Sequence, residues 1–260
     1  MKKILVGFVF LTLIMGSCTK ENSESAGNIQ GMGDTPGDFE VKEPFTLPEG
    51  ISIIGDITGI ENPGTKGGDS KSISYSCYGS GGKMIKLMLT LVNRSDRPRT
   101  VFFPKGLLWK CEVPGYQDAI CLQTTWISLK ANSQRTITLN LYCINYGHSP
   151  SDNFAYYRFI GVTSSAVFNN LLRRIGWRMI NFEWLNPNPA KSVAVAGPTY
   201  EEITERMQNI VWNLTNFGKD LSDEDILFIE SIPELPESDI PLLDEQSQFP
   251  EYFEELILQE

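Results

Sequence analysis

The sequence predicts a mainly β domain, an Ig-like antiparallel β-sandwich that is followed by a packed helical segment. Three observations lead to this fold class. Several segments between residues 71 and 143 alternate apolar and polar side chains, polar turns separate these segments, and after Gly161 the apolar period changes to that of a helix. The chain has 260 residues, of which 41% are hydrophobic, so it is long enough for one large domain or two small ones.

The alternation is clearest in two segments. Residues 83–93 place leucine and isoleucine on one face at every second position, and residues 135–143 repeat the pattern with Cys143 as the last apolar position. Short strands at this regular spacing are typical of an antiparallel sandwich. Three further strands are expected: residues 71–78, a strand made of residues 100–103 and 106–111 that is interrupted at Pro104, and residues 119–129.

The helical segment carries recognisable start and stop residues. Ser164 is expected to cap a first helix, and Thr199 with Glu202 has the spacing of a capping box for a second helix that ends before Gly218. Ser222 is expected to cap a short last helix with an acidic first turn. These runs are too short for a separate domain, so the helices are expected to pack on the sandwich.

The first residues resemble a bacterial lipoprotein signal. Lys2 and Lys3 precede an apolar run from Ile4 to Met15, which is shorter than the roughly 20 residues of a membrane span but suits a signal peptide. Gly16 and Ser17 then lead to Cys18, with methionine at the position where such signals usually have leucine. Looser signals of this kind resemble those of Bacteroides-type bacteria. The resemblance implies cleavage after residue 17, acylation of Cys18 (palmitate among the acyl groups) and anchoring in a membrane.

The composition of the remaining chain divides it into parts. Residues 18–48 are rich in glycine and polar residues and are expected to form a flexible tether, whose acidic start resembles the export signal of surface lipoproteins. The sandwich is expected at 49–163 and the helices at 164–232. The acidic tail is expected at 233–260, because 14 Asp and Glu and no Lys or Arg occur from residue 220 onward. The expected location is the outer membrane or the cell surface.

Charge and histidine content exclude several classes of protein. The formal net charge is −10, which argues against a nucleic-acid partner. His148 is the single histidine and no Cys-x-x-Cys motif occurs, so we expect no metal site, no cofactor and no catalytic residues. A catalytic Cys143–His148 pair lacks an orienting third residue, and the protein is therefore not expected to be an enzyme. A hydrolase with paired carboxylates stays an alternative, because the spacing of the 32 acidic residues in sequence does not set their spacing in space.

Four cysteines besides Cys18 are candidates for disulfides. An even number of cysteines in an exported chain favours disulfide bonds, with three possible pairings. Cys111 and Cys121 lie ten positions apart, so one bond would close the loop between them, and Cys77 and Cys143 would then join two strands.

Four stretches resemble an Ig-like module of uncharacterised surface lipoproteins from Bacteroides-type bacteria. The similarity covers about residues 71–232 and implies an exposed β-sandwich without an established activity. The stretches are Val92–Ser95, Val101–Leu107, Tyr116–Asp118 and Leu141–Asn145.

Two shorter motifs resemble the thioester domains of Gram-positive adhesins. Tyr142-Cys143 resembles the first half-motif, and Met207 to Trp212, which contains Gln208, resembles the second, with Met207 in the place of the usual threonine. In that family a cysteine thiolate attacks a glutamine amide, releases ammonia and leaves an electrophile that captures host amines. The resemblance implies the same bond between Cys143 and Gln208. The alternative is a buried strand cysteine and an unrelated helix glutamine.

Anchor, tether and sandwich together favour a surface binding or adhesion module with a protein or glycan partner. An accessory structural subunit of an envelope complex is a second possibility, with the apolar end of the acidic tail as its docking element. The third possibility is a covalent adhesin that uses the Cys143–Gln208 thioester.

Replacement of Cys18 tests the anchor. Cys18→Ala is expected to move the protein from the detergent phase to the aqueous phase in a partition assay, because several acyl chains contribute about 0.8 kcal/mol per buried methylene. Continued fractionation of the variant with membranes would show that the anchor lies elsewhere.

Overall fold

The fold is built around a closed β-barrel. The computed structural model describes residues 24–61, 76–185 and 197–240. It is mainly β, with 35% of the residues in strands and 22% in helices, and six antiparallel strands close into a barrel. Its elements are β1 (Val41–Pro44), β2 (Ile51–Gly59), β3 (Ser76–Gly79), β4 (Ile85–Asn93), β5 (Arg99–Phe103), β6 (Leu107–Cys111), β7 (Ala119–Ile120), β8 (Thr125–Leu129), β9 (Ser133–Cys143), β10 (Tyr156–Thr163), α1 (Ala166–Ile175), α2 (Phe182–Leu185), α3 (Tyr200–Thr215), α4 (Asp223–Ser231) and the 3₁₀ turn η1 (Glu237–Asp239).

The barrel order differs from the predicted sandwich. The strands follow one another as β10-β2-β4-β9-β7-β6, and pairing of β6 with β10 closes the ring. β1 adds to β10, β3 adds to β9 in parallel, and β5 and β8 form a separate ribbon. The predicted Ig-like sandwich is thus corrected to a barrel, because closure leaves one continuous sheet rather than two facing sheets. The signal peptide 1–17, Cys18 and most of the predicted strand 71–78 lie outside the described residues.

Alternation along β9 divides the core into two layers. Leu139, Leu141 and Cys143 face the barrel interior, where they pack with Trp109 and other buried side chains. Tyr142, on the opposite face, contributes to a second buried cluster between the outside of the barrel and the helices. Because β9 therefore has no solvent-facing side at its end, every polar group there needs a partner inside the protein.

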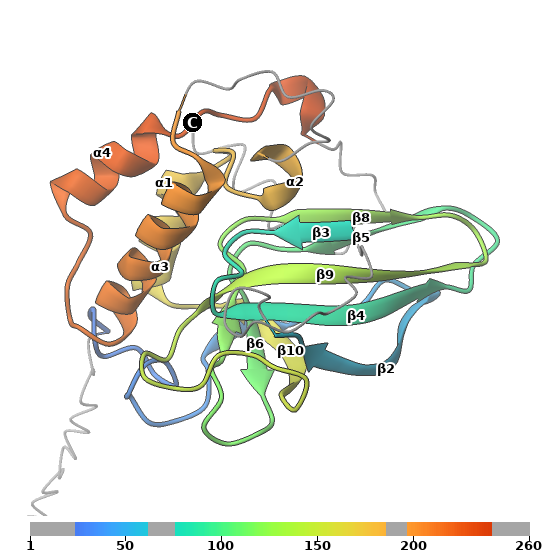
Figure 1. Ribbon diagram of the computed structural model, residues 1–260, viewed down its shortest axis with the longest axis horizontal. Helices are drawn as coiled ribbons and strands as arrows, with labels where there is room; N and C mark the ends of the chain where they lie inside the picture. Colours follow the sequence, from blue (N-terminus) through green and yellow to red (C-terminus); the bar gives the residue numbers. More distant parts are fainter. Residues whose placement is uncertain (1–23, 62–75, 186–196, 241–260) are drawn as a thin grey trace, which may run out of the picture.

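The helices begin where the capping residues predict. Thr199 and Glu202 form the reciprocal hydrogen bonds of a capping box at the start of α3, and Ser222 does the same with Asp225 at the start of α4. Ser165, one residue later than predicted, caps α1. In Figure 1, α1, α3 and α4 gather at one end of the barrel, next to the end of β9.

Residues 24–48 do not behave as the predicted tether. Ile29 and Met32 are buried in the cluster under the helices, and β1 pairs with β10. The Gly27 N–H donates to Leu214 O at 2.7 Å and the Gly33 N–H donates to Ile144 O at 2.9 Å, so this segment ties α3 to the chain after β9. The apolar residues of this segment are too few to show a period, but they are enough to fold it. They pack into the buried cluster that the helices and the outside of the barrel form.

The start of the predicted acidic tail is also folded. Leu235 is buried, and its N–H donates to Trp177 O at 2.9 Å. Residues 241–260 lie outside the described residues.

A partly buried carboxyl joins α2 to β3 at the barrel. Glu183 accepts hydrogen bonds from the Gly79 N–H at 2.8 Å and from Asn181 Nδ2 at 3.1 Å. Burial raises the pKa of Glu183 from 4.5 to about 7. The folded protein therefore keeps a proton on Glu183 at pH values where the unfolded chain has lost it.

The free energy of unfolding is expected to fall as the pH rises from about 4.5 to about 7. The proton on Glu183 stabilises the folded state fully below the pKa of the unfolded chain, and this contribution, at most about 3 kcal/mol, is lost as the pH passes the folded pKa. Glu183→Gln is expected to remove this decline in urea unfolding at pH 5 and pH 8. Glu230→Gln, at an exposed position of α4, is the control and should keep it. An unchanged pH dependence in Glu183→Gln would contradict the assignment.

Candidate functional site

The candidate site lies at the end of β9. Cys143 is opposite Ala119 of β7, and the next residue, Ile144, donates its N–H to Asp118 O at 3.1 Å. In an antiparallel ladder this pattern means that the N–H and C=O of Cys143 itself point away from β7. On that other side β4 has already ended, since its first residue, Ile85, lies opposite Leu141. The backbone of Cys143 therefore has no strand to pair with.

Gln208 of α3 takes the place of the missing strand. Its Oε1 accepts from the Cys143 N–H at 3.0 Å, and its Nε2 donates to the Cys143 O at 2.8 Å. Gln208 lies on the buried face of α3, where an unpaired amide would be costly, and these two bonds satisfy it. The structure thus brings together the two residues of the predicted thioester.

The sulfur of Cys143 has its own polar neighbours. Trp212 lies one helical turn after Gln208 on α3, and its Nε1–H donates to Cys143 Sγ at 3.4 Å. The Asn145 N–H also donates to Sγ at 3.4 Å, and the thiol donates to Asn145 O at 3.3 Å. One face of α3 therefore contacts both the backbone and the sulfur of the same cysteine.

The site is closed to water in this structure. Cys143 has no exposed surface and Gln208 keeps 5% of its own. Burial raises the pKa of the Cys143 thiol to about 12, although the hydrogen bonds from Trp212 and Asn145 act in the opposite direction. The sulfur is therefore a protonated thiol at neutral pH.

Asn145 and Asn216 hold the loop that covers the site. Asn145 Oδ1 accepts from the Asp118 N–H at 2.9 Å, and Asn145 Nδ2 donates to Gly33 O at 3.4 Å. Asn216, the residue that ends α3, accepts from the Tyr146 N–H at 3.1 Å. The loop after β9 is thus fixed to β7, to the N-terminal segment and to α3 at once. No sequence pattern indicates this role of the two asparagines, because they act through backbone groups of distant segments.

Three aromatic rings stand over the loop. Tyr146 packs edge to face on Trp212 and on Phe217, with ring centroids 5.0 Å apart in both pairs. Tyr146 and Phe217 are about half exposed, whereas Trp212 is partly buried. The indole that contacts the sulfur therefore packs against the half-exposed ring of Tyr146, which packs in turn against Phe217.

The predicted disulfides are not formed. Cys77, Cys111, Cys121 and Cys143 are all free thiols. Cys77 lies opposite Thr138, five residues along β9 from Cys143 and thus roughly 17 Å away. Cys121 pairs with Leu107, four residues along β6 from Cys111, or roughly 13 Å. Both distances exceed the roughly 7 Å between Cα atoms that a disulfide allows.

His148 lies away from the sulfur. Its ring Nδ1 is 3.1 Å from Tyr116 O, in an exposed part of the loop after β9. The polar contacts of Cys143 Sγ are made by Trp212 and Asn145, so no Cys–His pair is assembled.

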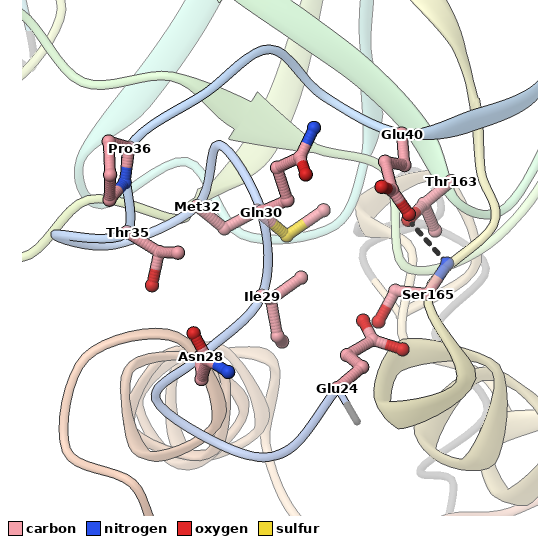
Figure 2. A pocket seen from close by; sticks show the side chains of 10 residues that line it. All are labelled: Glu24, Asn28, Ile29, Gln30, Met32, Thr35, Pro36, Glu40, Thr163 and Ser165. Atoms are coloured by element: carbon pink, nitrogen blue, oxygen red, sulfur yellow. Dashed lines mark hydrogen bonds between the residues drawn. The ribbon is translucent and has the colours of Figure 1, made fainter. Parts of the chain in front are cut away.

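Two cavities lie near the N-terminal segment and the loop. The first, of about 270 Å³, is bounded by Glu24, Glu40 and the start of α1, and Figure 2 shows its lining, with the Ser165 N–H donating to Thr163 Oγ1 at 3.1 Å. The residues that contact Cys143 do not line it. The second, of about 470 Å³, includes Asp118 and His148 and opens beside the loop that Asn145 holds.

Comparisons with known proteins give no relative. No family model, curated protein or solved structure matches the chain. Within the described residues, no group of three or more His, Cys, Asp or Glu is placed to hold a metal ion. Among the helices of that same part, none is long and apolar enough to cross a membrane.

The contribution of the Gln208 hydrogen bonds to the free energy of unfolding can be measured separately from thioester formation. Adding Gln208→Ala to Cys143→Ala is expected to lower the free energy of unfolding by about 1–3 kcal/mol, because the backbone N–H and C=O at position 143 lose their partners inside the protein. Neither protein is able to form a thioester, so urea unfolding of the two compares the hydrogen bonds alone. A difference near zero would mean that water or another group replaces Gln208.

Proposed function

We propose that the protein is a lipid-anchored surface module that captures an amine-bearing partner covalently through a thioester between Cys143 and Gln208. The lipid on Cys18 and the location at the outer membrane or cell surface rest on the sequence. The thioester rests on the two half-motifs and on the contact of the Gln208 side chain with the backbone of Cys143.

The observation that carries the proposal is the double hydrogen bond between Gln208 and Cys143. Both polar atoms of the Gln208 amide contact the backbone of the residue whose sulfur would attack it, at 3.0 and 2.8 Å. Holding the reacting groups together removes much of the entropic cost of a bond-forming step. The proposal is supported by a buried glutamine held against the backbone of a buried cysteine 65 residues away in the sequence.

The reaction balances without a cofactor. Cys143 Sγ attacks Gln208 Cδ, the S–C bond forms, the C–N bond breaks, and the Nε2 group leaves with the thiol proton as ammonia. A primary amine of the partner then attacks the same carbon. The C–S bond breaks, the Cys143 sulfur recovers a proton that the amine loses, and the partner is left joined through an amide.

Burial of Cys143 would protect a thioester from water, but it also means that part of the structure has to move before a partner amine is admitted. Water has no access to Cys143 Sγ in this structure, which protects a thioester from hydrolysis. A partner amine reaches Cδ when the ring of Tyr146 and the loop below it move. The neighbouring cleft of about 470 Å³ offers space for an incoming side chain.

A second candidate is a binding module without covalent capture. The exposed rings of Tyr146 and Phe217 favour it, because half-exposed aromatic side chains in a cluster are a common feature of recognition surfaces. In that case the role of Gln208 is limited to its hydrogen bonds with the Cys143 backbone at the end of β9.

Intact mass separates the two candidates. The wild-type chain is expected to be lighter than its sequence by about 17 Da, the mass of the ammonia lost, and incubation with methylamine is expected to bring it to about 14 Da above the sequence mass. Cys143→Ala and Gln208→Ala should abolish both shifts, and Cys121→Ala, another buried cysteine, should keep them. A wild-type mass equal to the sequence mass, unchanged by methylamine, would refute the covalent function.

A further inference from the structure

We propose that the indole N–H of Trp212 and the peptide N–H of Asn145 form a two-donor site for negative charge on Cys143 Sγ, which makes this sulfur an effective leaving group when an amine attacks the thioester. The inference rests on the proposed function. It assigns a catalytic role to Trp212 and a positioning role to the side chain of Asn145.

Charge develops on the sulfur in both steps of the reaction. Sγ carries it when it attacks Gln208 and again when the C–S bond breaks. A thiolate in the dry end of the barrel is unfavourable, and burial is the main reason why the pKa of this thiol is raised to about 12. Donors that are already in place, at 3.4 Å each, stabilise the charge without any rearrangement.

The other groups that face the sulfur do not supply this charge stabilisation. Asp118 acts against a thiolate, but its carboxylate is paired with Lys110 Nζ at 2.8 Å and accepts from the Cys111 N–H at 2.7 Å. The Asn145 carbonyl accepts from the neutral thiol at 3.3 Å and thus favours the protonated form. The two N–H groups are therefore the contacts that favour the anion.

Each donor is held by structure beyond the site. Trp212 is fixed by α3, one turn after Gln208, and by the edge-to-face contact with Tyr146. The Asn145 peptide is fixed because its side chain bonds to the Asp118 N–H and to Gly33 O. The Asn145 side chain thus acts through its own backbone, which makes it a positioning group.

The test uses the full chain and follows two reactions of the thioester by intact mass. Trp212→Phe removes the donor and keeps a ring against Tyr146, so both methylamine capture and spontaneous hydrolysis are expected to slow by about ten- to a hundredfold, the effect of one hydrogen bond to a charged group. Trp126→Phe, on β8, is the control and should leave both rates unchanged. A merely structural role of Trp212 predicts the opposite sign for hydrolysis, because a loosened cover admits water.

Asn145→Ala provides a second variant in case Trp212→Phe fails to fold. It is expected to slow capture and hydrolysis together, because the Asn145 peptide loses the side-chain bonds to the Asp118 N–H and to Gly33 O that hold it. Hydrolysis that is unchanged or faster in the folded variants overturns the two-donor site. It does not contradict the proposal that the thioester forms. Absence of the mass loss of about 17 Da in the wild type overturns the proposed function, and the inference falls with it.

Discussion

The rest of the site depends on one constraint, the pairing of the backbone at the end of β9. This strand extends two residues beyond β4, so the N–H and C=O of Cys143 are buried without a ladder partner. Gln208 supplies both missing bonds. A shift of α3 by one residue would turn the amide by about 100° around the helix axis and lose both. The hydrogen bonds of Gln208 therefore fix the register of α3 against the barrel, and the place of Trp212 follows from it.

The N-terminal segment, residues 24–48, also holds α3 and the chain after β9 in place. Gly33, at φ 59°, approaches α3 so closely that a Cβ atom would lie 2.2 Å from Thr215 O, which no side chain tolerates. Its N–H bonds to Ile144 O and its C=O to Asn145. The barrel, α3 and the N-terminal segment thus meet around Ile144 and Asn145, the two residues that follow Cys143.

The sequence predicts elements where local chemistry decides and fails where distant pairing decides. Alternation located β4 and β9, and capping residues located α3 and α4, because both signals lie within one element. Closure into a barrel depends on β6 meeting β10 and on the two-residue strand β7, which no local period reveals. The even number of cysteines suggested disulfides, but strand register keeps the two expected pairs apart. For the site, motifs pointed to Cys143 and Gln208, whereas Asn145 depends on partners at residues 33 and 118.

The chemical identity of residue 208 follows from the same burial that protects the sulfur. A carboxylate on α3 at this depth would be costly to desolvate and would lack a donor for the Cys143 C=O. An amide is neutral, donates and accepts, and so satisfies both backbone groups before any reaction. In the proposed reaction its nitrogen would leave as neutral ammonia, so the reactants and the thioester would carry no net charge. In the proposed reaction, negative charge would develop on the carbonyl oxygen of residue 208 and on Cys143 Sγ, and the indole N–H of Trp212 contacts the second of these atoms.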